Sequence, residues 1–210
     1  MDSTDAADLI AELHEERAES ALDDRFRGRA ALLIAALAAV LAIGGLGGGN
    51  ATDDMVGNNI KASDSWAFYQ AKNVRQTMYE MAADELKDQL AAGSLTPAGK
   101  AAAEARLAKY EATVKRYDSE PDPKAPGDPL KGEGKKELKA RAQSFEQGFE
   151  QASERDNNFD LAEVLLQLAL VLGSVAILAL SRWTLIVSAL LGIAGSLLTL
   201  NGFFLLVPLG

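Results

Sequence analysis

Five carboxylates stand at the edges of long apolar stretches, where charged groups could act on ions. Acidic side chains that ring the mouth of a pore attract cations. One interpretation of the chain is therefore a small cation channel with an acidic helical vestibule. The carboxylates concerned are Asp53, Asp54, Asp156, Asp160 and Glu163.

The other chemical signals are weak. The GGLGGG run at 44–49 resembles a phosphate-binding loop, but it lacks the following Lys and Ser or Thr and comes after an apolar helix. We interpret it as a flexible helix end. His14, the only histidine, lies among glutamates and is expected to be solvated. The chain has no cysteine, so it cannot form a disulfide or a cysteine-bound metal site.

An enzyme is the least supported class, because no nucleophile–base pair and no ligand cluster is visible in the sequence. We expect no catalytic residue, no cofactor and no metal. The basic run KGEGKKELKAR at 131–141 is interleaved with Glu133 and Glu137. It predicts a solvated helix start, and we expect no nucleic-acid partner.

Three apolar blocks, at 30–47, 161–181 and 183–207, hold much of the chain's hydrophobic content. Each is near the roughly 20 residues that an α-helix needs to cross a bilayer. The acidic tail at 1–29 is too long and too acidic for a secretory signal, so the first block predicts an uncleaved anchor. The sequence therefore predicts an all-α membrane protein with three transmembrane helices.

The basic residues that flank these spans predict an orientation, because Lys and Arg gather on the cytoplasmic side. Four arginines lie in the 1–29 tail, and Arg182 stands between the second and third spans. Only Lys61 and Arg155 lie equally close on the other side. We expect a multi-pass inner (plasma) membrane protein with a cytoplasmic N-terminus, and with 50–160 and the C-terminus outside.

The middle region, 50–160, is expected to be an extramembrane antiparallel helical hairpin or bundle. Helix-forming residues predict helices at about 58–92, 97–118 and 134–160. Gly93, Thr96 and Pro97 form a stop and restart between the first two. The Pro-rich segment at 119–133 predicts an exposed loop. The third helix is expected to continue without a break into the second span.

The third helix carries apolar residues at the alternating four-and-three spacing of a coiled-coil seam. The helix at 58–92 is its expected partner. The seam is defined by Leu138, Phe145, Phe149 and Phe159.

The stretch ASDSWAFYQAKNVR at 62–75 places apolar side chains on two opposed faces. At 100° per residue, Phe68, Ala71 and Met78 share one face, opposite Trp66 and Tyr69. We expect the Phe68 face to pack on the seam of the third helix. Trp66 and Tyr69 then meet the helix at 97–118, the lipid headgroups or another copy of the chain, and we favour another copy.

This stretch, with FDLAEVLLQLALVLGSVAIL at 159–178, resembles a family of bacterial membrane proteins known as domain of unknown function 4337 (DUF4337). The resemblance covers about residues 25–200 and implies a membrane location and this architecture. It implies no activity. The positions that match the family's aromatic motif form, with Phe68, a predicted assembly motif: Asp64, Trp66, Phe68, Tyr69, Gln70, Lys72 and Arg75.

Small and polar residues form a stripe along the second and third spans. Such residues let helix backbones approach and hydrogen-bond across the contact, which we favour over an ion path. Two function classes stay open: an oligomeric structural or interaction component of the cell envelope, with the bilayer, other copies and possibly an envelope protein as partners, or the cation channel. The stripe comprises Glu163, Gln167, Ser174, Ser188, Gly192, Gly195 and Thr199.

Overall fold

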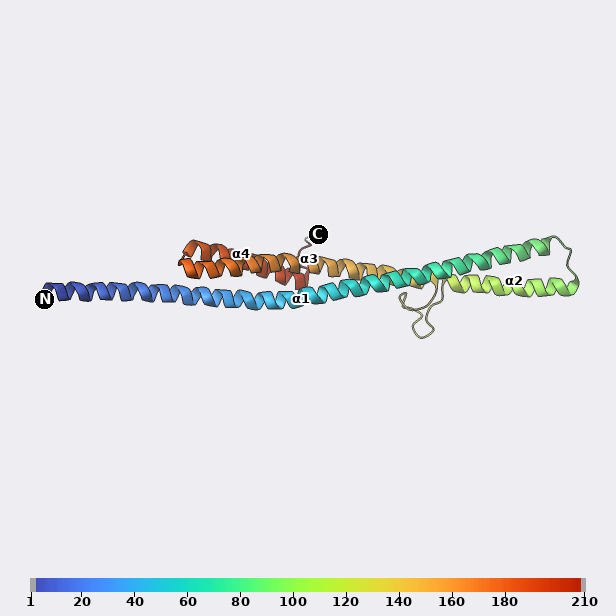
Figure 1. Ribbon diagram of the computed structural model, residues 1–210. Coiled ribbons are helices and arrows are strands. Elements are labelled where there is room, and N and C mark those ends of the chain that lie inside the picture. The colour runs from blue at the N-terminus through green and yellow to red at the C-terminus, as the bar shows by residue number, and fades with distance from the viewer. Residues whose placement is uncertain (1–2, 209–210) are drawn as a thin grey trace. The chain divides into compact units, whose positions relative to one another are not determined.

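The computed structural model describes residues 3–208 and contains, over that range, four α-helices and no strand (Figure 1). The helices are α1 (Ser3–Ala91), α2 (Pro97–Asp118), α3 (Lys135–Ala179) and α4 (Arg182–Phe204). The all-α prediction is confirmed. Three of the helices, α1, α3 and α4, contain segments long and apolar enough to cross a membrane.

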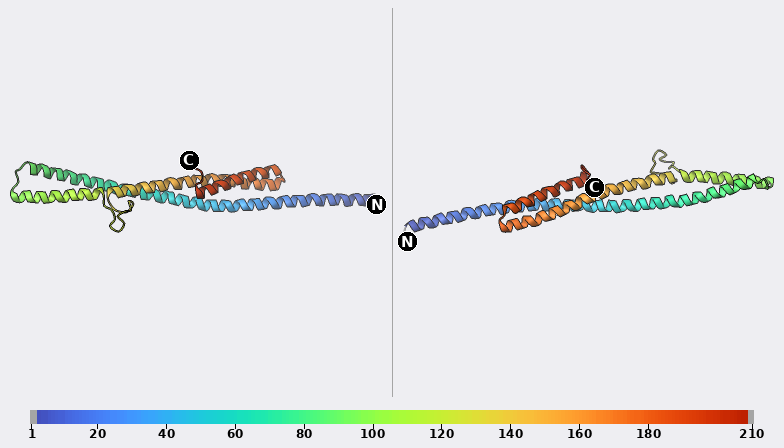
Figure 2. Two further views of the ribbon diagram at one scale, coloured as in Figure 1. Left: turned by 180° about the vertical axis from the view of Figure 1, so that it is seen from behind. Right: turned by 90° about the horizontal axis from the view of Figure 1, so that it is seen from above.

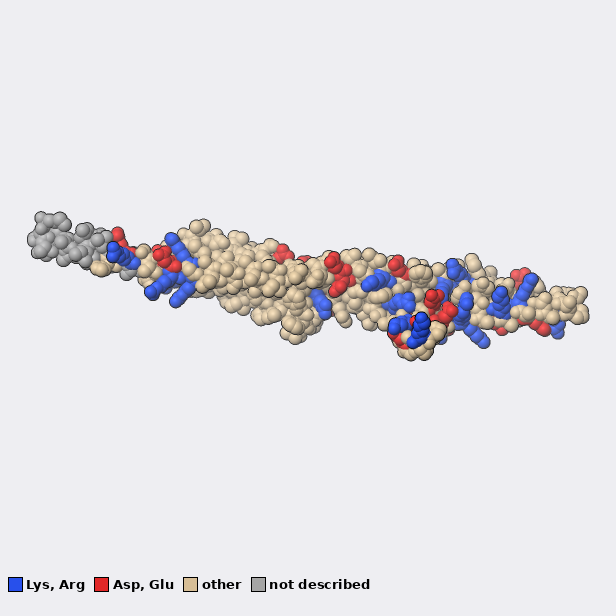
Figure 3. Space-filling model, turned by 90° about the horizontal axis from the view of Figure 1, so that it is seen from below, with Lys and Arg blue, Asp and Glu red and all other residues tan. Residues whose placement is uncertain are grey.

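The chain divides into two compact units. The apolar unit comprises residues 1–53 and 152–210, and the hairpin unit comprises residues 54–151. Helices α1 and α3 contribute residues to both. On the face drawn in Figure 3, charged side chains gather over the hairpin unit, whereas few lie on the surface of the apolar segments.

The glycine run at 44–49 does not end a helix, because α1 continues through it to Ala91. Our expectation of a flexible helix end there is wrong. The reason is tertiary packing. A Cβ at Gly47 would lie 2.5 Å from the ring of Phe159, and one at Gly202 would lie 2.8 Å from it. The glycines therefore provide a flat helix surface on which an aromatic ring of α3 packs.

Small residues also let the three helices of the apolar unit pack closely. Leu37 of α1 and Leu166 of α3 form a buried core with Ala169. Gly192 and Gly195 of α4 lie against Leu37 and Leu166, where an added Cβ would come within 2.5 Å and 2.8 Å of them. This close approach is the arrangement that small residues allow in packed membrane helices.

The two apolar helices α3 and α4 end earlier than the sequence predicts, at residues 179 and 204 instead of 181 and 207. Leu180 (φ 50°) and Leu205 (φ 46°) take the left-handed conformation that terminates a helix. After α4, the Asn201 side chain holds the backbone of Val207, accepting from its N–H at 2.9 Å and donating to its carbonyl at 2.8 Å.

The hairpin unit consists of one long α1 segment with two shorter helical segments along it. Figures 1 and 2 both show α2 running beside the C-terminal part of α1. The turn between them is the predicted stop and restart: Gly93 has φ 64°, and the Thr96 hydroxyl accepts a hydrogen bond from Gly99 N–H at 3.1 Å. The return path passes through the Pro-rich loop before α3 begins.

Different stretches of α1 contact α2 and α3. Tyr79 packs against Tyr110 and Tyr117 of α2, with ring centroids 5.4 Å and 5.9 Å apart. Nearer the other end of the unit, the Lys61 ammonium lies 5.6 Å from the Phe145 ring of α3. The third helix therefore pairs with only part of the 58–92 segment, and α2 covers the rest.

Candidate functional site

The aromatic motif at 62–75 packs toward α3 with the face that carries Trp66 and Tyr69. These two rings are in edge contact, with centroids 5.5 Å apart at 80°. The Trp66 indole N–H donates to the Glu146 carboxylate, with 2.7 Å from Nε1 to Oε1. Ala62 and Ser65, each 5% exposed, are the small residues on the same face. Small side chains there let α3 approach, and the aromatic rings flank the contact.

Lys72 is the residue of the motif whose charge is paired with acidic side chains of the Pro-rich loop. Its ammonium lies 3.4 Å from a Glu120 carboxylate oxygen and 3.9 Å from one of Glu133, and its side chain is only 14% exposed. The Tyr117 ring lies 5.6 Å away. A lysine whose stem is buried and whose charge has two acidic partners fixes the position of the loop that carries them.

The opposite face of the motif is exposed. Asp64, Gln70 and Arg75 are all exposed, and Phe68 retains 65% of its accessible surface. Our assignment of the two faces is therefore wrong. The structure gives Trp66 and Tyr69 partners within the chain and leaves Phe68, Ala71 and Met78 outside. Both faces are apolar enough for burial, and the polar tip of Trp66 finds its acceptor on α3.

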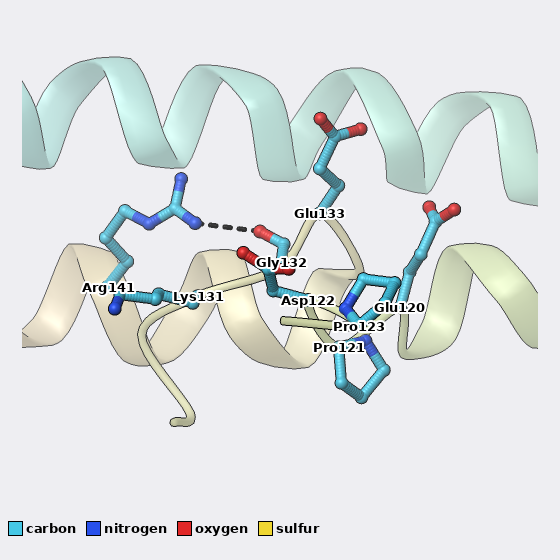
Figure 4. Close-up of a pocket in the computed structure, with 8 residues that line it drawn as sticks. All are labelled: Glu120, Pro121, Asp122, Pro123, Lys131, Gly132, Glu133 and Arg141. Carbon is cyan, nitrogen blue, oxygen red and sulfur yellow. Dashed lines mark hydrogen bonds between the residues drawn. The ribbon is translucent and has the colours of Figure 1, made fainter. Parts of the chain in front are cut away.

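The Pro-rich loop folds into a defined structure beside the motif, with a cavity of about 580 Å³ on its surface (Figure 4). Arg141 holds the loop by donating to two carbonyls, that of Leu130 at 2.9 Å and that of Gly132 at 2.7 Å. The Arg141 guanidinium is therefore hydrogen-bonded to backbone carbonyls of the loop. The cavity is lined by Glu120, Pro121, Asp122, Pro123, Lys131, Gly132, Glu133 and Arg141.

Glu137 is the second anchor of this loop. Its carboxylate accepts hydrogen bonds from the Ser119 hydroxyl at 2.6 Å and from the Glu120 N–H at 3.1 Å. Burial raises the pKa of this carboxyl, but the hydrogen bonds and the nearby Lys136 outweigh that effect and hold the pKa below its ordinary value of 4.5. Glu137 is only 7% exposed, so the prediction of a solvated helix start is wrong at this residue.

The predicted seam of α3 lies on its packed side. Leu138 and Phe159 are each 4% exposed. Phe145 and Phe149 are half-buried, and Phe145 lies beneath the ammonium of Lys61. In the hairpin unit, Gly148 lies against Asn58 of α1, which lets the two helices approach where a side chain would collide.

Comparison with known proteins identifies the family from most of the chain. The family model described as "Domain of unknown function (DUF4337)" matches residues 26–205. The chain belongs to the DUF4337 family. The resemblance seen in the aromatic motif is thereby confirmed. No curated protein and no solved structure matches the chain.

In this DUF4337 protein the polar stripe of the apolar helices divides into two parts. The part on α4 is buried: Ser188 donates to the Ala169 carbonyl of α3 at 2.6 Å, and Gly192, Gly195 and Thr199 face the other helices. The part on α3 is exposed. Gln167 donates to Glu163 at 2.8 Å, and Ser174 donates to the Leu170 carbonyl of its own helix.

A buried amide pair in the apolar unit was missed by the sequence reasoning. Asn201 of α4 donates to the Asn158 side chain of α3 at 2.7 Å, and Asn158 donates to the Glu154 carbonyl. Their exposed fractions are 8% and 2%. Asn201, a polar residue near the end of the apolar α4, is the signal in the sequence that points to such a pair, whereas Asn158 lies in the polar stretch ERDNNFD at 154–160 and gives none. The hydrogen bonds join α3 to α4 and, through Asn201, to Val207 after α4.

The side chains that could bind a metal ion are the histidine and the carboxylates. Among the residues that the structure describes, no three His, Cys, Asp or Glu side chains gather closely enough to hold a metal ion. His14 is exposed. Of the five carboxylates at the edges of the apolar stretches, Asp156 accepts a hydrogen bond from Thr52 at 2.8 Å within the apolar unit.

Proposed function

We propose that this DUF4337 protein is an oligomeric structural or interaction component of the bacterial inner membrane, without catalytic activity. The segments at 30–47 in α1, 161–179 in α3 and the whole of α4 cross the bilayer. The N-terminus is cytoplasmic, and the hairpin unit and C-terminus lie outside. Partners are the bilayer, other copies of the chain and a membrane or envelope protein, but not nucleic acid.

The observation that carries the proposal is the exposed polar pair Glu163 and Gln167 on an apolar helix. Both side chains are exposed, and Gln167 donates to Glu163 at 2.8 Å. A charged group at the bilayer centre costs about 2.5–3.5 kcal/mol, and one near the edge, as at Glu163, costs less. Gln167 lies one helical turn deeper, and intramembrane polar groups face a protein partner or water. A monomer would leave this pair against lipid, whereas a neighbouring copy would cover it.

The test is the mass of the full-length protein in a gentle detergent, compared with a Glu163→Leu, Gln167→Leu double variant. The parent should be an oligomer, and the variant should dissociate into monomers at a lower detergent concentration than the parent. Val164→Leu, at an exposed apolar neighbour on the same helix, is the matched control and should behave like the parent. A parent that is monomeric in both detergent and nanodiscs would reject the proposal.

A cation channel is the second candidate, because Asp160, Glu163, Gln167 and Ser174 follow one another on exposed positions of α3. Copies arranged around an axis with this face inward would form a polar path with an acidic mouth. Purified protein in liposomes separates the candidates. Cation flux that falls on Glu163→Gln would establish the channel, and the absence of flux from oligomeric protein would favour the structural role.

A further inference from the structure

The outward face of α1 in the hairpin unit carries an apolar stripe that α2 and α3 leave mostly exposed, although Phe68 lines a groove with Leu138 of α3 and Met78 one with Tyr110 of α2. Its large side chains are each more than half exposed: Val56, Ile60, Phe68, Val74, Met78 and Met81. In a hairpin whose helices form a single layer, each helix buries only the face that it turns toward its neighbour. The inner face of α1 is already used by Ala62, Trp66 and Tyr69, so the outer stripe needs a separate partner.

The spacing of the outer stripe is that of a coiled coil. Seven residues of this face follow one another at alternating intervals of four and three, and we call this set the outer seam. It comprises Ile60, Asp64, Ala67, Ala71, Val74, Met78 and Met81. A repeat of 3.5 residues keeps one line of side chains against a partner helix over several turns. Scattered exposed apolar residues are normal on a protein surface, but a continuous seam with this period marks a helix-binding face.

We propose that a second copy of this chain docks on the outer seam, with the two α1 helices parallel and in register. The inference rests on the proposed membrane oligomer and names its contact surface outside the apolar helices. Both copies hold the 30–47 segment of α1 in one bilayer, so both α1 helices point the same way. A two-fold axis then places each seam residue opposite its own counterpart.

The sequence of the seam suits a self-pairing. When the two helices are in register, Ala67 and Ala71 each face the same residue of the other copy. Their small side chains let the two helix axes approach closely. Phe68 flanks these layers and covers the gap that alanine leaves. On the seam's edges, Gln70 of one copy and Arg75 of the other fall at the positions that pair across a parallel coiled coil. Both side chains are exposed in the single chain.

The area available agrees with a contact that depends on the membrane. Residues 56–81 span about 39 Å of helix, and a helix about 10 Å wide then offers roughly 400 Å² per copy. Two such faces bury less than the roughly 1,200 Å² of a stable independent interface. Anchoring both chains in one bilayer raises their effective concentration, which lets a seam of this size pair.

Asp64 is the exception within the seam and provides a sharp test. In a parallel, in-register pair it faces the same residue of the other copy, and two like charges oppose each other. A polar residue at one core position of a coiled coil sets register at the cost of stability. Asp64→Asn should therefore strengthen the dimer, whereas Met78→Asp adds a second charged layer and should dissociate it.

The principal experiment uses the absence of cysteine in the full-length chain. Single variants Ala67→Cys, Val74→Cys and Met81→Cys are oxidised in native membranes, with Glu80→Cys as the exposed control. A disulfide needs Cα atoms within about 7 Å. Glu80 lies at least about 100° around the helix from each of the three seam positions. We expect at least tenfold more linked dimer at the three seam positions than at Glu80.

Each other outcome overturns the inference in a recognisable way. Linkage at Ala67→Cys without linkage at Met81→Cys would indicate antiparallel helices. Equal linkage at Glu80→Cys would indicate random collision. Protection of the three cysteines by a different polypeptide would replace the second copy with another partner. If the parent remains oligomeric but no seam cysteine links, this inference fails alone. A monomeric parent rejects the proposed function as well.

Unfolding must not be mistaken for dissociation. Met78 is 63% exposed in the single chain, so Met78→Asp should leave its helices intact. Circular dichroism of the full-length variant in detergent tests this directly. A Met78→Asp protein with parental helicity and parental oligomeric mass contradicts the outer seam.

Discussion

Trp66 of α1 and Glu146 of α3 are joined by a hydrogen bond of 2.7 Å, donated by the indole Nε1–H to the carboxylate Oε1. Trp66, the most distinctive residue of the family motif, therefore packs within the hairpin of its own chain. The contact is within an edge-packed cluster that includes Tyr69. It follows that the motif holds α3 with one face and leaves the other exposed.

This pair can be tested by a double-mutant cycle. Trp66→Phe keeps an aromatic ring and removes the donor, and Glu146→Gln keeps the shape and removes the charge. Each should destabilise the hairpin by about 1 kcal/mol, which is less than the roughly 1.5–3 kcal/mol of a buried bond to an ionised group, since this contact is partly exposed. Protease resistance of the full-length protein in increasing urea gives the measurement. Gln147→Ala, at an exposed position of α3 outside the outer seam, is the control. Additive losses in the double variant would show that the two residues act independently.

Acid should loosen the loop at 119–134 through Glu137. The pKa of this carboxyl is lower in the folded chain than its ordinary 4.5, so its ionised form stabilises the fold above that value. This stability is lost as pH falls through the lowered pKa. Cleavage of the loop by an acid-active protease should therefore accelerate as the pH falls below 4.5.

Glu137→Gln should make the loop susceptible at neutral pH and remove this part of the acid response. The matched control is Glu150→Gln, because Glu150 is an exposed acid of the same helix. A Glu137→Gln protein with parental cleavage rates at every pH would mean that the carboxylate does not anchor the loop.

The glycines of α1 allow a direct test of helix packing in the apolar unit. Gly47→Ala would place a methyl group 2.5 Å from the Phe159 ring and 2.9 Å from Phe203, and overpacking of this kind costs about 1–3 kcal/mol. At Gly49 nothing lies within 4 Å of an added Cβ. Gly49→Ala should be neutral or stabilise the helix by up to about 1 kcal/mol. Thermal unfolding in detergent should separate the two variants, and equal melting temperatures would contradict the packing.

The proposed orientation is tested with reporters that are active only outside the cytoplasm. Fusions after Gly93 and after Gly210 should be active, and a fusion after Arg182 should be silent, because arginines favour the cytoplasmic side. The opposite pattern would invert the orientation while leaving the helices themselves unchanged.

The sequence by itself determined the elements whose causes are local. Apolar length predicted the three candidate spans, and the order Gly93, Thr96, Pro97 predicted where α2 begins. The family was also recognisable from two short stretches, at 62–75 and 159–178. These features are set by residues that lie close together in the sequence, so they can be recognised without knowing the fold.

Only the tertiary structure decided how those elements use their faces. Helical periodicity shows which residues lie together, but not which partner they meet. It placed Phe68 and Trp66 on opposite faces and could not say which faces α3. The same limit applies to Gly47 and Glu137. Gly47 remains helical because Phe159, distant in sequence, packs on it, and Glu137 is buried because the loop folds back to supply two hydrogen-bond donors.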